Sequence, residues 1–407
     1  MMTNFYLSRY AYPQQHIKEN PSPDLGLVVT IPCFNEPNLI RSLDSLHKCL
    51  KPVKGVEIIV VINQSEKDST EVNQQNEKSF DEAKVWADKT STDQFKTHVI
   101  YVNDLPTKHA GVGLARKIAM DEAVRRFESI GNLDGIIACF DADSTCDNNY
   151  LVELEQHFKL HDKTPGCSIY FEHPLDQENQ EPIIYYELFL RYYVHGLRYA
   201  GFPHAYQTVG SSMAVRSWPY QKQGGMNRRK GGEDFYFLHR IIPLGNYTEL
   251  NTTRVLPSPR KSDRVPFGTG RSMLDWGKGK KDLSKFYSPQ IFEDLKLLID
   301  KAGELYSNDS IAGLPESVVG FLNEIDFDEA YKRIRQQSKT PDQFRKHFFQ
   351  WFDGFKVLKY VHYARDNYYP QVGINKVNQW LGEQHNQRFP VTPREFLLQL
   401  RHLDQVK

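Results

Sequence analysis

Several hallmarks of other protein classes are missing from this sequence. The 407 residues include 51 Lys+Arg and 51 Asp+Glu, so the formal net charge is zero. This balance excludes a whole-surface attraction to nucleic acid or to an anionic membrane, and leaves room only for local basic patches. The longest strongly apolar stretches, such as residues 56–62, are far shorter than the roughly 20 residues of a membrane-spanning helix. We therefore expect no nucleic-acid partner and no transmembrane segment.

The N-terminal stretch also lacks the features of an export signal. Residues 1–20 show no basic start, no apolar centre and no small-residue cleavage site. The sequence therefore predicts a cytoplasmic protein. Peripheral contact with the inner face of a membrane stays open, because such contact needs no spanning segment.

The cysteines form no recognisable framework. There are five, an odd number, and they include no C-x-x-C motif and no zinc-type spacing with histidine. Free thiols in a reducing compartment are the simplest interpretation. The five are Cys33, Cys49, Cys139, Cys146 and Cys167.

What the sequence does contain is a regular alternation over residues 25 to about 145. Short apolar, β-branched runs alternate with amphipathic or polar helix-compatible segments. This order predicts a mostly parallel sheet with helices on both faces, in which ligands bind beyond the carboxyl ends of the strands. The predicted strands are 27–31, 56–62, 98–102 and 135–140, and the predicted helices between them are 39–50, 65–87 and one whose apolar stripe runs from Ala115 to Phe127.

The remainder of the chain is predominantly helix-compatible. A Pro- and Gly-rich stretch at 257–270 predicts a loop that ends the catalytic domain. The predicted domains are an N-terminal segment of residues 1–24, a catalytic domain of 25–270 and a helical C-terminal domain of 271–407. The aromatic-rich segment 182–200 is predicted as a core helix that covers the sheet, in preference to an acceptor-binding or membrane-interface surface. Further helices are predicted at 291–305, 315–324, 327–337, 341–360, 375–384 and 393–406.

Two carboxylates follow the fourth predicted strand. Asp141 and Asp143 stand at positions i and i+2, and an extended backbone would direct both side chains to one side. There a divalent cation could bridge them to a phosphate. Acidic pairs are abundant on solvated surfaces, so this motif alone does not establish a site.

A second acidic pair follows two glycines. Gly231-Gly232-Glu233-Asp234 precedes an apolar, helix-like run at 235–242. Carboxylates at a helix start can serve as caps, or one of them can act as a general base held at a rigid helix terminus.

Basic residues gather in and near the predicted 257–270 loop. Such residues in a loop suit a lid over a diphosphate, whose charge must be covered as it leaves, although each taken singly can equally be surface charge. The set is Arg254, Arg260, Lys261 and Arg264, with Lys108 and Arg116 upstream.

Taken in order along the chain, these segments resemble the family 2 glycosyltransferases of the GT-A fold. The resemblance covers roughly residues 25 to 270. It rests on five loose motifs in the expected order, which together are specific. They are Ile31-Pro-Cys-Phe-Asn-Glu36, Val60-Val-Ile-Asn63, Gly111 to Arg116, Asp141-Ala-Asp143, and Gly224-Gly225 with Gly232-Glu-Asp234.

This resemblance implies a Rossmann-like, mostly parallel nucleotide-binding sheet flanked by helices, with a C-terminal helical extension. It implies a hexosyltransferase-type enzyme in which Asp141 and Asp143 hold Mn²⁺ or Mg²⁺, and Asp234, beside Glu233, is the catalytic base. The residues implied around the nucleotide sugar are Pro32, Asn35, Glu36, Asn63, Lys108, Arg116, Asp141, Arg260 and Arg264.

The implied reaction is transfer with inversion from a nucleotide-diphosphate sugar, with UDP- or GDP-sugar favoured, to a saccharide or lipid-linked acceptor in cell-envelope glycan or glycolipid synthesis. Asn63 stands where the family usually has aspartate, which leaves the base of the nucleotide open. The Q-x-x-R-W motif of processive members is absent, which favours transfer of single sugars over polymerisation.

Three alternatives remain at this stage. Residues 141–145 also fit the D-x-D-x-T motif of haloacid-dehalogenase-type phosphatases, although that motif ordinarily follows the first strand of its domain and not the fourth. A retaining GT-A transferase would share the D-x-D without needing the base. A non-catalytic nucleotide-sugar-binding scaffold would use the same fold without turnover.

Overall fold

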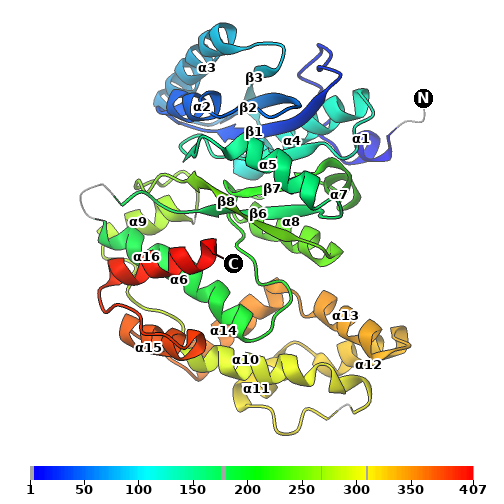
Figure 1. The fold of residues 1–407 in the computed structure, drawn as a ribbon, viewed down its shortest axis with the longest axis vertical. Coiled ribbons are helices and arrows are strands. Elements are labelled where there is room, and N and C mark those ends of the chain that lie inside the picture. The colour runs from blue at the N-terminus through cyan, green and yellow to red at the C-terminus, as the bar shows by residue number, and fades with distance from the viewer. Residues whose placement is uncertain (1–3, 176–179, 267, 309, 407) are drawn as a thin grey trace. The chain divides into compact units, whose positions relative to one another are not determined.

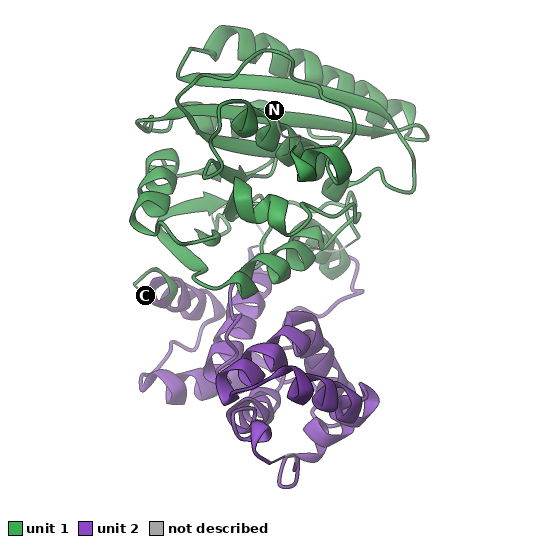
Figure 2. Cartoon of the chain, turned by 90° about the vertical axis from the view of Figure 1, so that its right-hand side faces the viewer, with its two compact units in different colours: residues 1–177, 208–277, 404–407 green, residues 178–207, 278–403 purple. Residues whose placement is uncertain are grey.

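The structure is a computed structural model that describes residues 4–175, 180–266, 268–308 and 310–406. The chain divides into two compact units, shown in different colours in Figure 2. Unit 1 comprises 1–177, 208–277 and 404–407, and unit 2 comprises 178–207 and 278–403. These units and the predicted domains divide the chain at different places, because 178–207 groups with the helices that follow residue 277.

Unit 1 is built on an eight-stranded mixed sheet in the order β3-β2-β1-β4-β7-β6-β8-β5 (Figure 1). The first four strands of this order pair in parallel, whereas β7 is antiparallel to both β4 and β6. Strand β8 is parallel to β6 and antiparallel to β5. The strands are β1 (Leu25–Cys33), β2 (Gly55–Ser65), β3 (Phe95–Leu105), β4 (Ile136–Cys139), β5 (Thr145–Cys146), β6 (Gly166–Phe171), β7 (Met213–Arg216) and β8 (Thr248–Leu256).

The parallel half of the sheet is the part that the sequence predicts. Every residue of β1 and β2 is buried, as expected for strands covered on both faces. The helices α2 (Leu39–His47) and α3 (Thr70–Thr90) connect β1 to β2 and β2 to β3, while α4 (Val112–Ser129) returns from β3 to β4. Right-handed crossovers in opposite directions put α2 and α3 on one face and α4 on the other.

The rest of unit 1 consists of short elements around this sheet. The N-terminal segment is tied to α4, because Tyr6 Oη donates to Asp121 Oδ1 at 2.6 Å and the Tyr12 amide donates to Asp121 Oδ2 at 2.7 Å. Residues 1–3 of the predicted N-terminal segment lie outside the described residues. The other helices are α1 (Phe5–Arg9), α5 (Tyr150–Leu160), α7 (Ser217–Lys222), α8 (Glu233–Ile241), η1 (Ile242–Leu244) and α9 (Thr269–Gly277).

Unit 2 is helical, as predicted for the C-terminal region. Its elements are α6 (Glu181–Tyr199), α10 (Pro289–Lys301), η2 (Glu304–Tyr306), α11 (Glu316–Glu324), α12 (Phe327–Gln337), α13 (Pro341–Trp351), α14 (Gly354–Asn367), α15 (Ile374–His385) and α16 (Pro393–Gln405), the last of which ends in unit 1.

Two predicted helices differ from the structure. The predicted single helix 341–360 is two helices: α13 ends at Trp351, and Asp353 caps α14 by accepting a hydrogen bond from the Lys356 amide at 2.9 Å. Helix α6 is a core helix, but it belongs to unit 2, where the ring of Tyr192 lies 5.4 Å from that of Phe292 on α10. No helix within the described ranges is long and apolar enough to cross a membrane.

Candidate active site

The loop after β4 carries the first acidic pair. The Ser144 amide donates to the Asp141 carbonyl at 3.0 Å, so Asp141 to Ser144 form a turn. The extended conformation predicted for this motif is therefore wrong. The turn is held in place from α2, because Ser42 Oγ donates to the Ala142 carbonyl at 2.8 Å. Asp141 and Asp143 consequently meet different arginines.

Arg116, in the first turns of α4, joins the two acidic motifs. Its Nη2 donates to Asp141 Oδ1 at 2.7 Å, and its Nη1 donates to Glu233 Oε1 at 2.6 Å. The side chain of Arg116 is only 2% exposed. Two charge-assisted hydrogen bonds, of which the one to Glu233 is buried and the one to Asp141 partly buried, thus fix the D-x-D turn against the start of α8. The direct partners of Arg116 in this structure are carboxylates.

The second acidic pair begins α8. Gly232 precedes it with φ 66°, a left-handed conformation that favours glycine. Burial raises the pKa of Glu233 to about 7, with Arg116 opposing the shift and Asp234 adding to it. Burial also raises the pKa of Asp234, again opposed by Arg116. The Phe235 amide donates to Asp234 Oδ1 at 2.7 Å, which orients this carboxylate.

Gly210 closes this cluster. A Cβ at this position would lie 2.4 Å from Arg116 Nη1 and 3.0 Å from Asp234 Oδ2. We expect Gly210→Ala to displace the Arg116 side chain, to destabilise the fold by about 1–3 kcal/mol, and to reduce any turnover at Asp234 by about 10²-fold. Urea denaturation and a turnover assay measure the two effects. Unchanged stability and unchanged turnover would show that the backbone at residue 210 shifts to accommodate the added methyl group.

The pKa of Glu233 also predicts a pH dependence of stability. A folded-state pKa of about 7, above the usual 4.5, means that the folded protein holds this proton more tightly than the unfolded chain. The resulting stabilisation is complete below about pH 4.5 and is lost as the pH rises through about 7. The Glu233→Gln variant has no carboxyl group to titrate at this position. As the pH rises from 5 to 8, the urea midpoint of wild type should therefore fall relative to that of the variant. Parallel curves would contradict the assignment.

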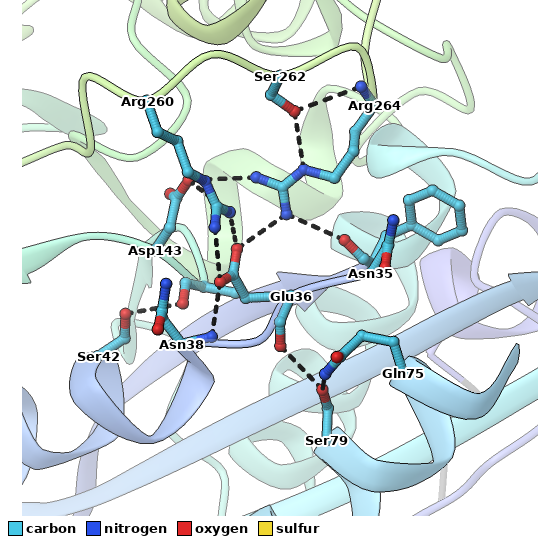
Figure 3. A network of polar contacts seen from close by, with 12 residues as sticks. Asn35, Glu36, Asn38, Ser42, Gln75, Ser79, Asp143, Arg260, Ser262 and Arg264 are labelled. Atoms are coloured by element: carbon cyan, nitrogen blue, oxygen red, sulfur yellow. Dashed lines mark hydrogen bonds and ion pairs between the residues drawn. The ribbon is translucent and has the colours of Figure 1, made fainter. Parts of the chain in front are cut away.

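A second cluster is centred on Glu36, whose side chain is fully buried (Figure 3). Arg260 binds both of its carboxylate oxygens, with Nη1 to Oε1 at 2.9 Å, and Arg264 Nη1 donates to Oε2 at 2.8 Å. The Asn38 amide donates to Oε1 at 2.8 Å. Figure 3 shows the two guanidinium groups descending from their loop toward this one carboxylate.

The same two arginines also reach Asp143. Its Oδ2 lies 3.0 Å from Arg260 Nη2 and 3.3 Å from Arg264 Nη2. Burial and the neighbouring Asp141 raise the pKa of Asp143 to about 6, and Arg264 opposes that shift. The loop that the sequence predicts over 257–270 is therefore tied to the D-x-D turn by ion pairs. Residue 267 of this loop lies outside the described residues.

The remaining predicted nucleotide-binding residues are more scattered. Asn63 is 2% exposed, and its Oδ1 is buried without a hydrogen-bond partner. Asn35, at φ 49°, donates its amide to Asn76 Oδ1 at 2.8 Å. Pro32 is buried within β1, opposite Val61. Lys108 is exposed, and within the described ranges no ion pair links it to the acidic clusters.

Sequence reasoning misses the supporting residues of the site. Asn76 lies in a long polar helix, α3, and Ser42 lies on α2; neither stands out, because their roles arise only from contacts with distant loops. Gly210 is visible in the sequence as the start of a Gly-Ser-Ser run, and that run is the signal that points to it. Arg254 pairs with Asp147 at 2.9 Å and with Glu172 at 2.5 Å, so it serves the sheet edge at β8.

The donor atoms at the D-x-D turn fit a divalent cation. The side chains of Asp141 and Asp143 are 40% and 21% exposed. Mg²⁺ commonly takes one or two protein carboxylates and completes its shell with water and substrate phosphates. Within the described residues no group of three or more His, Cys, Asp or Glu could hold a metal by itself. The site thus suits a cation that arrives with a phosphate ligand.

Comparison with known proteins agrees with this geometry. Residues 28–217 match the model of the family described as Glycosyl transferase family 2. This match covers just under half of the chain, and the α/β sheet with its flanking helices is the one expected of the GT-A fold. The class of enzyme that the match indicates is a glycosyltransferase.

Solved structures with a resemblance to the chain include TarS of S. aureus. Residues 1–349 of TarS in complex with UDP-GlcNAc share 15% identity, with 90% of this chain and 94% of that chain covered and a TM-score of 0.40. The same piece with UDP shares 14% identity over the same shares of both chains, at a TM-score of 0.39. No curated protein matches the chain significantly. Likenesses this distant do not bear on the chemistry of the site.

Proposed function

We propose that the chain transfers a single sugar from a nucleotide-diphosphate donor, a UDP- or GDP-sugar, to an acceptor hydroxyl with inversion and with the help of Mn²⁺ or Mg²⁺. The observation that carries this proposal is the position of Arg116, which holds Asp141 of the D-x-D turn and Glu233 of the second acidic pair within one cluster. The candidate phosphate-binding and base motifs therefore share one site.

Each motif has a chemical role in such a transfer. Asp234 takes the proton of the attacking hydroxyl, and its raised pKa brings it nearer to the operating pH of a general base. The Phe235 amide orients it, and Arg116 pairs with the neighbouring Glu233. Asp141 and Asp143 would hold the cation, which when bound supplies positive charge to the leaving diphosphate. Arg260 and Arg264 add guanidinium groups to the same phosphates.

Asn63 is the residue proposed to contact the base of the nucleotide. Its buried Oδ1 has no partner in the protein, and a buried acceptor without a partner is costly. An N–H of a nucleobase would satisfy it. If the side-chain amide is turned by 180°, its N–H₂ group takes the same position and can donate to a nucleobase instead. The thermal-shift series therefore decides which nucleobase binds.

The test is a thermal-shift series with UDP, GDP, CMP and dTDP, each with and without Mn²⁺. A ligand that binds only the native state at 100 times its Kd stabilises by about 2.7 kcal/mol. We expect one nucleotide to raise Tm in a metal-dependent manner, and Asp143→Ala to abolish that shift. Asp263→Ala, at an exposed position of the 257–270 loop, is the matched control and should retain it.

The outcomes separate the alternatives. A nucleotide shift that ignores both Mn²⁺ and Asp143→Ala would contradict the metal site. Absence of any shift, together with phosphate release from simple phosphomonoesters, would favour the phosphatase interpretation. With a donor in hand, the anomeric configuration of the product distinguishes inversion from retention.

The biological setting is part of the same proposal. A saccharide or lipid-linked acceptor of a cell-envelope glycan, modified in the cytoplasm, is the setting that the family resemblance favours. Incubation of the identified donor with envelope extracts, followed by detection of the labelled sugar in the lipid or glycan fraction, tests it. Label found only in free sugar would contradict it.

A further inference from the structure

Two cysteines that are far apart in the sequence face each other in unit 1. Cys49 follows the end of α2, and Cys146 is the last residue of β5. Their sulfur atoms lie 3.6 Å apart. Neither the odd cysteine count nor the spacing in the sequence indicates this pair.

The backbone holds both thiols in position. The Cys146 amide donates to Ser45 Oγ of α2 at 2.9 Å, and the Leu50 amide donates to the Asn148 carbonyl at 2.8 Å. These bonds lie on either side of the sulfur contact. They connect the segment after α2 to the segment after the D-x-D turn. The backbone therefore keeps the two sulfur atoms close together.

The pair is also accessible from one side. Cys49 is 4% exposed, whereas Cys146 is of intermediate exposure. The other three cysteines are at most 1% exposed, and no described thiol lies in hydrogen-bond contact with them: Cys33, Cys139 and Cys167. Chemistry at a thiol should therefore begin at Cys146. The contact between the two sulfurs lowers the pKa of Cys49, while the same contact and burial raise the pKa of Cys146, and either sulfur can be the donor. Exposure, and not acidity, is what favours Cys146 as the first thiol to react.

We propose that Cys49 and Cys146 form a reversible disulfide when the protein meets a peroxide. The sulfur of Cys146, once its proton has passed to solvent, attacks one oxygen of the peroxide; the O–O bond breaks, and Cys146 becomes a sulfenic acid as the leaving oxygen takes up a proton and departs as water or an alcohol. The sulfur of Cys49 then attacks that of Cys146. The S–S bond forms, the S–O bond breaks, and the departing hydroxide takes the proton of Cys49 as water. Two thiols are oxidised, and one peroxide is reduced.

The disulfide would act on the nearby acidic turn. An S–S bond is about 2.05 Å long, so the sulfurs must approach from 3.6 Å. Helix α2, which carries Ser45 against Cys146, also holds the D-x-D turn through Ser42 and Ala142. Misplacement of a catalytic group by about 1 Å can cost 10²-fold in rate. We expect oxidation to slow the transfer at least tenfold, an effect that rests on the proposed function.

The bond itself is tested without any activity assay. The purified full chain is treated with hydrogen peroxide, denatured and alkylated, and free thiols are counted. Wild type should fall from five thiols to three, with Cys49 and Cys146 joined in one peptide pair, and dithiothreitol should restore five. Cys167→Ala, the control for a buried cysteine outside the pair, should fall from four to two. Cys49→Ser should leave a sulfenic acid on Cys146, trapped by dimedone.

Failure of either part is recognisable. A wild-type protein in which Cys146 is over-oxidised to sulfinic acid as fast as in Cys49→Ser, with no joined peptides, would overturn the disulfide. If the disulfide forms and Cys146→Ser loses activity in peroxide as wild type does, the bond does not control the site. A protein that forms the bond and responds to no nucleotide would refute the proposed function while the disulfide stands.

Discussion

Replacement of Asp234 by asparagine is expected to lower kcat by about 10²- to 10⁴-fold and to leave nucleotide binding unchanged. This range is the usual contribution of a positioned general base. Asparagine keeps the shape of the side chain and a carbonyl oxygen that can accept the Phe235 amide, so the start of α8 should remain intact. What it loses is the capacity to take the acceptor proton.

The measurement is release of nucleoside diphosphate from the donor identified by thermal shift. Asp263→Asn makes the same chemical change at an exposed position of the 257–270 loop and should behave as wild type. Equal kcat in Asp234→Asn and wild type would remove Asp234 from the role of base. A parallel loss of the nucleotide-dependent rise in Tm would mean that the site had been disturbed structurally.

Arg116→Gln should have the largest effect on stability, a loss of about 3–5 kcal/mol, because removal of one partner leaves buried charges uncompensated. Glu233, with its side chain 5% exposed, loses the guanidinium that pairs with it, and Asp141 loses the same partner. The urea midpoint at pH 7 measures the loss. A second substitution, Glu233→Gln, should recover part of it, because the buried carboxylate is then absent.

Arg126→Gln supplies the matched control on the same helix. Arg126 is 3% exposed and pairs with Glu57, which is 4% exposed, at the other end of α4. The Arg126→Gln substitution should therefore lower the free energy of unfolding in a similar way, while the molecules that remain folded should still bind nucleotide. If Arg116→Gln unfolds no more easily than wild type, the cluster around Arg116 is solvated and the proposed coupling of the two acidic motifs fails.

The elements predicted well from sequence are those whose burial does not depend on which other elements pack against them. The runs 27–31 and 56–62 are buried on both faces, so their apolar character survives any arrangement of neighbours. Strand β5 has only two residues and pairs with β8 across more than a hundred positions, so no local pattern marks it. The break between α13 and α14 depends on one capping carboxylate, Asp353, inside an otherwise continuous helical pattern.

The candidate site divides in the same way. The motifs around Asp141 and Asp234 are visible because chemistry requires particular residue types next to one another in the chain. Their connection is not visible: the contact of Arg116 with Glu233 spans 117 positions, and that of Arg260 with Glu36 spans 224. The thiol pair at Cys49 and Cys146 is likewise a product of the fold.

The ion pairs of Arg260 and Arg264 have a consequence for how a donor enters. With Glu36 and Asp143 as their partners, the two guanidinium groups are already paired with carboxylates of the protein itself. A lone phosphate anion should bind weakly there, because it must displace the carboxylates that already pair with the same guanidinium groups. Under the proposed function, a diphosphate accompanied by a divalent cation would exchange both sets of partners together, because Asp143 would bind the cation while the arginines bind phosphate oxygens. Nucleotide and metal should therefore each bind weakly alone and more tightly together. Free phosphate at cellular concentrations should not occupy the site.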